Sequence, residues 1–211
     1  MAFAMEVLGE RWAMLIVREL MLGPRRFSDL RASLPGISAK VLTERLEGLA
    51  EWGVLERRTL PPPAAAQVYE LTEWGYSADS AINALGRWAA QSCRHDGSLP
   101  LSSVSLMASM RTMQLPEELA SSPDMVVGVA IGNETFRCEV SGGRFANARG
   151  PLDGCDVVLR ADDARPIARA LYAGMPLSAL EENLGLAVEG NRDMAGRFVT
   201  LFALPSKLDA E

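Results

Sequence analysis

Polar and basic side chains are concentrated between residues 25 and 58, and their types suit contacts with a nucleic acid duplex. Lysine can donate to guanine, threonine can bond to several base edges, and glutamate can accept from the amino group of cytosine. The candidates for base contacts are Ser38, Lys40, Thr43 and Glu44. Arginine binds phosphates without reading sequence, and the candidates for this role are Arg25, Arg26, Arg57 and Arg58. A helical hairpin with a solvated charged face would contain the same residues, so both interpretations stay open here.

Two short helices separated by a tight turn are predicted to position these side chains. Ser28 can cap the first helix, and Pro35-Gly36 ends it and supplies the turn. The second helix is predicted to begin after Ser38 as its N-cap and to end at Gly53. Its buried face is marked by apolar residues at helical spacing: Leu42, Leu46 and Leu49. Because a recognition helix reads bases mainly from its N-terminal turns, the residues just after Ser38 are the ones placed to do so.

A strand pair follows the second helix. Residues 54–58 and 67–72 have strand composition, and a Pro-Ala loop over residues 61–66 joins them. A short hairpin beside a recognition helix is a wing. The segment therefore has the element order of a winged helix-turn-helix.

Five motifs within residues 5–92 carry a family resemblance: GERW at 9–12, LGPRRFSDL at 22–30, PGIS at 35–38, KVLTERL at 40–46 and LTEWG at 71–75. In these motifs the chain resembles the HxlR-type winged helix-turn-helix regulators. The resemblance implies a homodimeric bacterial transcription factor that binds double-stranded DNA. Many relatives carry a sensing cysteine shortly before the first helix, and this chain has none there, which argues against a thiol switch in this domain. Ala64-Ala65-Ala66-Gln67 replaces a basic residue common in the family's wing, so we expect weak or purely steric wing contacts.

Two amphipathic helices flank the motif region. The first is predicted over residues 5–22 as scaffold for the helix-turn-helix. The second is predicted over residues 74–91, with small apolar residues and Trp88 on one face. In the family such a helix builds the dimer seam, and a symmetric dimer would present two recognition helices to a palindromic operator. Packing of this face inside the monomer is the alternative.

The second half of the chain changes character after an interruption near residues 93–101. We predict a winged helix-turn-helix and dimerisation domain over residues 1–95 and a second domain over residues 100–208. Strands are expected at 125–131, 134–140, 144–147, 155–159 and 186–189, and helices at 101–119 (broken near Pro116), 162–172, 177–183 and 192–202. The fold class is therefore α+β, and we expect the second domain to be an antiparallel sheet backed by helices.

That element order resembles the sterol-carrier-protein type of lipid-binding domain, chiefly through NETFRCEVSGGRF, CDVVLRADD, YAGMP and LGLAVEGNRDMAGRFVTLF. The resemblance implies an apolar tunnel for a hydrophobic molecule. Carried over, its lining would include Met107, Met110, Phe136, Phe145, Leu171, Tyr172, Met175, Phe198 and Phe202. Each of these residues could equally be plain core.

Charge and composition set further bounds. The net charge is −6, yet residues 1–98 hold 11 basic and 12 acidic side chains while residues 99–211 hold 10 and 15, so the acidity lies mainly in the second half. No apolar run approaches the ~20 residues of a membrane span. Three cysteines without paired spacing are typical of reduced thiols in a cytoplasmic protein. Motifs for catalysis, phosphate loops or metal clusters are absent from the sequence, so we expect neither an enzyme nor a cofactor.

These observations predict a one-component regulator, expected to act as a repressor, that binds a palindromic operator as a homodimer. Its second domain is expected to sense a hydrophobic small molecule. Two alternatives remain. The second domain could be structural in a constitutive regulator, or the chain could be a lipid carrier that does not bind DNA.

Overall fold

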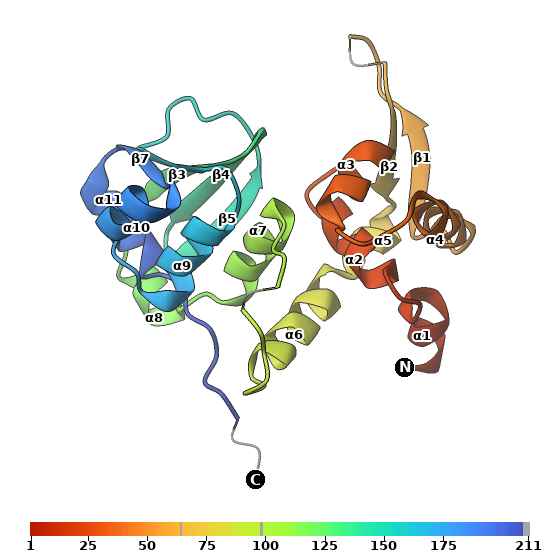
Figure 1. Cartoon of the computed structure of the whole chain (residues 1–211), viewed down its shortest axis with the longest axis horizontal. Helices are drawn as coiled ribbons and strands as arrows, with labels where there is room; N and C mark the ends of the chain where they lie inside the picture. The colour runs from red at the N-terminus through yellow and green to blue at the C-terminus, as the bar shows by residue number, and fades with distance from the viewer. Residues whose placement is uncertain (64, 98, 209–211) are drawn as a thin grey trace. The chain divides into compact units, whose positions relative to one another are not determined.

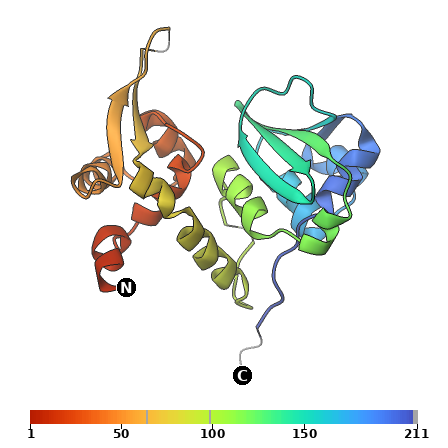
Figure 2. The same cartoon turned by 180° about the vertical axis from the view of Figure 1, so that it is seen from behind.

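The computed structural model describes residues 1–63, 65–97 and 99–208 (Figures 1 and 2). It contains two compact units, Met1–Ile82 and Asn83–Glu211. Helix α6 (Asp79–Ala90) crosses the boundary between them. The expected domain ranges, 1–95 and 100–208, remain a prediction. Within the described residues, none of the helices is both long and apolar enough to span a bilayer.

The first unit contains a helical group and a two-stranded wing. Its elements are α1 (Ala2–Leu8), α2 (Ala13–Leu20), α3 (Phe27–Ser33), α4 (Ala39–Glu51), β1 (Leu55–Thr59), β2 (Gln67–Leu71) and α5 (Glu73–Ser77). Apolar residues from α2, α3, α4 and the wing strands form one core cluster, in which Leu30 and Leu42 are fully buried. The wing strands pair antiparallel, with Leu55 opposite Leu71. The predicted helix-turn-helix and wing are thus present.

The single helix expected over residues 5–22 is wrong, because the chain breaks between α1 and α2. Trp12 adopts a left-handed backbone (φ 80°) directly before α2. A Cβ at Gly9 would lie 2.2 Å from the carbonyl oxygen of Met5, so only glycine fits there. Helical periodicity runs through both segments, which is why the sequence pattern did not indicate the break.

The expected cap of α3 is also wrong. Arg26, not Ser28, occupies the N-cap position of α3. The Asp29 carboxylate accepts a hydrogen bond of 3.3 Å from the Arg26 backbone N–H and so satisfies one donor of the first turn. Ser28 lies inside that turn, where its hydroxyl donates to Asp29.

The second unit contains a five-stranded sheet and several helices. Its elements after α6 are α7 (Ser103–Thr112), α8 (Pro116–Ala120), β3 (Met125–Ile131), β4 (Glu134–Ser141), β5 (Arg144–Arg149), β6 (Val157–Ala161), α9 (Arg165–Ala173), α10 (Leu177–Leu184), β7 (Ala187–Gly190) and α11 (Arg192–Val199). The strand order is β5-β4-β3-β6-β7. This arrangement confirms the α+β class.

The prediction of an antiparallel sheet is wrong at one pairing, because β6 runs parallel to β3, with Val129 opposite Leu159. The chain does not return from β5 by a hairpin. Residues 150–156 instead cross over the sheet, and a Cβ at Gly128 would lie 2.9 Å from Leu152 and 3.2 Å from the Cys155 sulfur. Glycine at this position of β3 therefore leaves room for the crossover.

The two faces of this sheet differ, as the strand register requires. Val127, Val129, Phe136 and Leu159 share one face and are fully buried, and α11 contacts β3, β6 and β7. The opposite face carries ion pairs, such as Arg160 with Glu189 at 3.0 Å. The core of the second unit thus lies between the sheet and its helices.

Candidate nucleic-acid interface and ligand groove

The N-terminal turns of α4 present the predicted base-contacting residues. The Ser38 hydroxyl accepts from the Val41 backbone N–H at 3.2 Å, which confirms Ser38 as the N-cap. Ser38, Lys40, Thr43 and Glu44 are all exposed, whereas Leu42, Leu46 and Leu49 are at most 3 % exposed. The apolar face fixes α4 to the core, and the polar face is left available for a partner.

Lys40 and Glu44 form a loose pair on this face. Their charged atoms lie 3.8 Å apart, and their side chains are 85 % and 48 % exposed. An exposed pair at this helical spacing contributes only about 0.3–0.5 kcal/mol. The Lys40 ammonium can therefore leave Glu44 for a phosphate or a guanine at little cost.

The predicted phosphate-contacting arginines divide into two kinds. Arg26 is exposed at the start of α3, while Arg57 donates to Gln67 and Arg58 pairs with Glu70 on the exposed wing. Arg25 contradicts its predicted role, because it is only 6 % exposed and its guanidinium donates to the Ser33 hydroxyl at 2.9 Å. Its backbone also pairs with Tyr69 of β2. Arg25 therefore joins α3 to the wing rather than projecting toward solvent.

Thr72 and Gly75 of the LTEWG motif form a junction between the wing and the end of α4. The Thr72 hydroxyl donates to the Gly53 carbonyl at 2.7 Å and accepts from the Gly75 N–H at 3.1 Å, which caps α5. A Cβ at Gly75 would lie 2.0 Å from the Val54 carbonyl oxygen. The threonine and glycine of the LTEWG motif thus bring α5 against the chain that leaves α4.

The wing tip consists of small and cyclic residues. Pro61, Pro62 and Pro63 are exposed, and Ala64 lies outside the described residues. No basic residue occurs between Leu60 and Gln67 in the sequence. The expectation of weak or steric wing contacts stays a prediction.

An exposed apolar stripe follows the predicted dimerisation helix. On α6, Leu85 is 48 % and Trp88 69 % exposed. They lie three positions apart, so they share one face of the helix. Large exposed apolar side chains on one helix face are characteristic of an interaction surface.

Most of the predicted ligand-contacting residues lie in the core of the second unit. Met107, Met110, Phe136 and Phe198 are fully buried. Phe145 packs edge to face on Phe202 at 5.0 Å. The Tyr172 hydroxyl lies 2.6 Å from the Ser109 hydroxyl, and burial raises the pKa of Tyr172 to about 12. These contacts join α7, α9 and α11 to the sheet.

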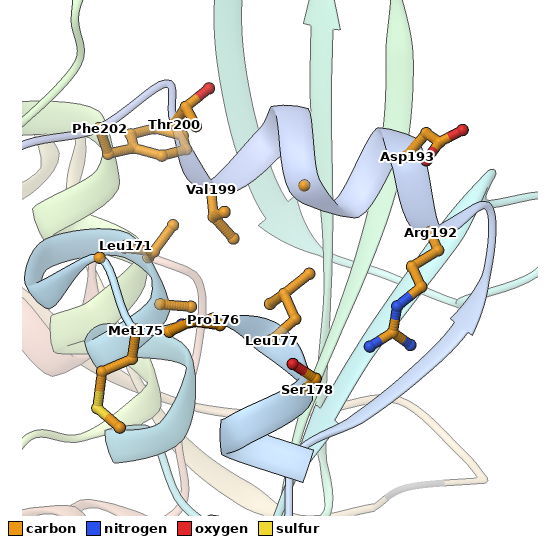
Figure 3. A pocket seen from close by; sticks show the side chains of 13 residues that line it. Leu171, Met175, Pro176, Leu177, Ser178, Arg192, Asp193, Val199, Thr200 and Phe202 are labelled. Carbon is orange, nitrogen blue, oxygen red and sulfur yellow. The ribbon is translucent and has the colours of Figure 1, made fainter.

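A groove of about 640 Å³ lies between α9, α10 and α11 (Figure 3). Of the predicted ligand-contacting residues, Leu171, Met175 and Phe202 line it. Its other lining residues were not predicted from the sequence: Ala170, Gly174, Pro176, Leu177, Ser178, Arg192, Asp193, Gly196, Val199 and Thr200. They come from two stretches of the chain, α9 to the start of α10 and α11 with its end, so no local pattern indicates that they meet.

The groove has an apolar middle and a charged end. Leu171, Leu177 and Val199 point into the middle, while Arg192 and Asp193 lie at one end (Figure 3). The Arg192 guanidinium donates to both carboxylate oxygens of Glu181. This pairing lowers the pKa of the Glu181 carboxyl, so Glu181 is anionic at neutral pH.

The cysteines offer no metal or disulfide site in the parts of the chain that the structure describes. All three are free thiols, with Cys138 buried and Cys155 half-buried. Burial raises the pKa of both thiols, which disfavours the reactive thiolate. No group of three metal-ligating side chains occurs among the described residues.

The matches to known proteins fall on the segment that contains the helix-turn-helix and wing. The HxlR-like helix-turn-helix family matches residues 7–97. The chain is 39 % identical over 93 residues to the HTH-type transcriptional regulator YodB of Bacillus subtilis, a match that covers 44 % of this chain and 83 % of YodB. The chain belongs to the HxlR-like helix-turn-helix family.

Further similarities concern the same part of this HxlR-like chain. YvaP of Bacillus subtilis, an uncharacterized HTH-type transcriptional regulator, is 36 % identical over 88 residues, which cover 42 % of this chain and 82 % of YvaP. The solved structure of the reduced form of YodB from B. subtilis is 38 % identical and covers 46 % of this chain and 95 % of that one, with a TM-score of 0.41. Family membership thus confirms the resemblance predicted for the first domain. The similarity of the second domain to sterol carrier proteins stays a prediction.

Proposed function

We propose that this HxlR-like protein is a DNA-binding transcriptional regulator that inserts the N-terminal turns of α4 into the major groove. The observation that carries the proposal is the exposed row formed by Ser38, Lys40 and Thr43 on a helix whose opposite face is buried in the core. Arg26 before α3 and Arg57 and Arg58 on the wing are exposed and could supply charge for phosphates. The overall charge of −6 does not oppose this, because the local field near α4 governs the encounter.

The regulator acts as a homodimer on a palindromic operator. Support comes from the apolar stripe on α6, where Leu85 and Trp88 are exposed. On the same helix, a Cβ at Gly86 would meet no atom within 4 Å, so a second helix could approach the backbone closely there. A two-fold axis near α6 would relate the α4 helices of the two subunits, so that each contacts one half-site of the operator.

The second unit controls operator binding in response to a hydrophobic small molecule, and the regulator acts as a repressor. The strap, residues 203–208, supports a route for this control, because it continues directly from Phe202 of the groove to the end of α6. Leu208 donates from its backbone to the Gln91 carbonyl at 2.8 Å. The Lys207 ammonium donates to the carbonyls of Ala90 at 2.8 Å and Ser92 at 3.2 Å. A ligand that displaces Phe202 would therefore shift residues 203–208, and with them the C-terminal end of the proposed dimer helix α6.

The test of DNA binding starts from operator duplexes selected from a random pool with the full-length protein. Fluorescence anisotropy then compares the wild type with Lys40→Ala/Thr43→Ala. Loss of two such contacts should cost about 2–4 kcal/mol, equal to a roughly 30- to 1,000-fold weaker Kd. Glu51→Ala, an exposed change at the other end of α4, is the matched control and should bind like the wild type.

A double variant that is folded by circular dichroism and binds within threefold of the wild type would refute the role of α4. Failure to select any operator, together with uptake of a hydrophobic probe, would favour the lipid carrier. Operator binding that no hydrophobic molecule changes would favour the constitutive regulator.

A further inference from the structure

We infer that the groove between α9, α10 and α11 is the effector site, and that it takes a small apolar molecule whose polar end is uncharged. The inference rests on the proposed effector role of the second unit and specifies its site and ligand class. The lining of this groove differs from the tunnel lining expected from the sequence, because most of those expected residues lie in the core.

The first argument is the glycine in the wall of the groove. Gly196 lies in the interior of α11, where glycine is the least favourable residue after proline. A Cβ at this position would meet no atom within 4 Å, and its φ is an ordinary helical one, so neither packing nor backbone conformation requires glycine. The missing side chain keeps the groove open next to the helix backbone, where a ligand could lie.

The second argument is the size and surface of the groove. Its volume of about 640 Å³ lies within the range of about 300–1,000 Å³ that small-molecule sites occupy. Leu171, Leu177 and Val199 point into its middle from three different helices (Figure 3). The Ser178 hydroxyl is an uncharged polar group of the lining that can orient a ligand (Figure 3).

The third argument is the charge at the polar end. Arg192 is already paired with Glu181, so its positive charge is compensated. An anionic ligand would have to displace Glu181 from Arg192. An uncharged polar end avoids this cost.

The experiment uses two fluorescent probes that differ only in charge. N-phenyl-1-naphthylamine is neutral, and 1-anilinonaphthalene-8-sulfonate is the same ring system with a sulfonate. Titration of the full-length protein should show saturable binding of the neutral probe at one site per chain, with at least fivefold weaker binding of the sulfonate. Glu181→Gln, which removes the competitor for Arg192, should strengthen sulfonate binding several-fold.

Gly196→Leu should weaken binding of the neutral probe at least tenfold, because the new side chain fills the groove without a clash at its Cβ. Asn183→Leu is the matched control, since it places the same side chain on an exposed position of α10 outside the groove. Gly196→Ala, the smaller change, should fold at least as well as the wild type and give an intermediate loss. It keeps the test valid if Gly196→Leu does not fold.

Neutral-probe binding that is absent, or unaffected by both Gly196 substitutions, would overturn the site. Preference for the sulfonate probe in the wild type would overturn the ligand class. Operator binding without probe is measured in parallel, so failure at the groove is distinguishable from failure of the regulator proposal.

Discussion

Thr72→Val is the sharpest test of how the wing is held to α4. Valine has nearly the same shape as threonine, so the change removes the hydroxyl and creates no cavity. The hydroxyl loses its cap of α5, accepted from Gly75 N–H at 3.1 Å, and its donation, which is shared between the carbonyls of Gly53 at 2.7 Å and Val54 at 3.2 Å. An N-cap contributes about 1 kcal/mol, and a hydrogen bond from a hydroxyl to a backbone carbonyl contributes about 1 kcal/mol. We therefore expect the free energy of unfolding to fall by about 2 kcal/mol.

Urea unfolding followed by tryptophan fluorescence measures this change in the full chain. The four tryptophans are Trp12, Trp52, Trp74 and Trp88, so the signal comes from the first unit and α6. Thr59→Val, an exposed threonine on β1, is the control and should change the free energy by less than about 0.5 kcal/mol. Gly75→Ala should cost more, about 3 kcal/mol, because its Cβ would overlap the Val54 carbonyl oxygen. A Thr72→Val variant as stable as its control would refute the assignment of this junction.

The remaining predictions concern the dimer, the core, one carboxylate and the strap. Leu85→Ala/Trp88→Ala should convert the dimer to monomers in light scattering, without a loss of helix content. Asn147→Ala should lower stability by about 2–3 kcal/mol in chemical denaturation, because the buried amide donates to the Met107 carbonyl at 2.9 Å and accepts from Arg111 at 2.7 Å. The Gly142 N–H and the Ser141 hydroxyl lower the pKa of the Asp124 carboxyl below its ordinary 3.8. The stability that this carboxylate adds should therefore be present above pH 3.8 and disappear as the pH falls through its lower folded pKa. The free energies of unfolding of the wild type and Asp124→Asn, measured during acid titration, should converge at that pH. Lys207→Ala should leave probe binding unchanged but reduce the effect of the probe on operator affinity, as anisotropy with and without the probe would measure.

Much of the local structure that carries the candidate nucleic-acid interface was predictable because it depends on local sequence. The N-cap at Ser38, the buried leucine face of α4 and the two wing strands follow from patterns within about four residues of each other. The exposure of Lys40 and Thr43 follows in turn, since they lie on the face opposite the leucines. Arg25 could not be placed in this way, because its burial depends on Tyr69, which is distant in the sequence.

In the second unit, more of the structure depends on contacts between residues that are distant in the sequence. Its strands and helices were predicted within a few residues, yet the parallel pairing of β3 with β6 was not, because the crossover over Gly128 involves residues more than twenty positions away. The prediction of ligand-contacting residues rests on residue type and on resemblance to another family. Packing then put Met107, Met110, Phe136 and Phe198 in the core and left the groove to residues with less distinctive side chains.

By itself, the sequence determined which segments become helices and strands and which face of each is apolar, since periodicity and capping act over one or two turns. Only the tertiary structure decided the break before α2, the role of Arg25 and the open space beside Gly196. The physical reason is that burial and empty volume belong to sets of segments that meet in space. Gly196, for example, lines a groove only because residues of α9 and α10 form the other walls of that groove.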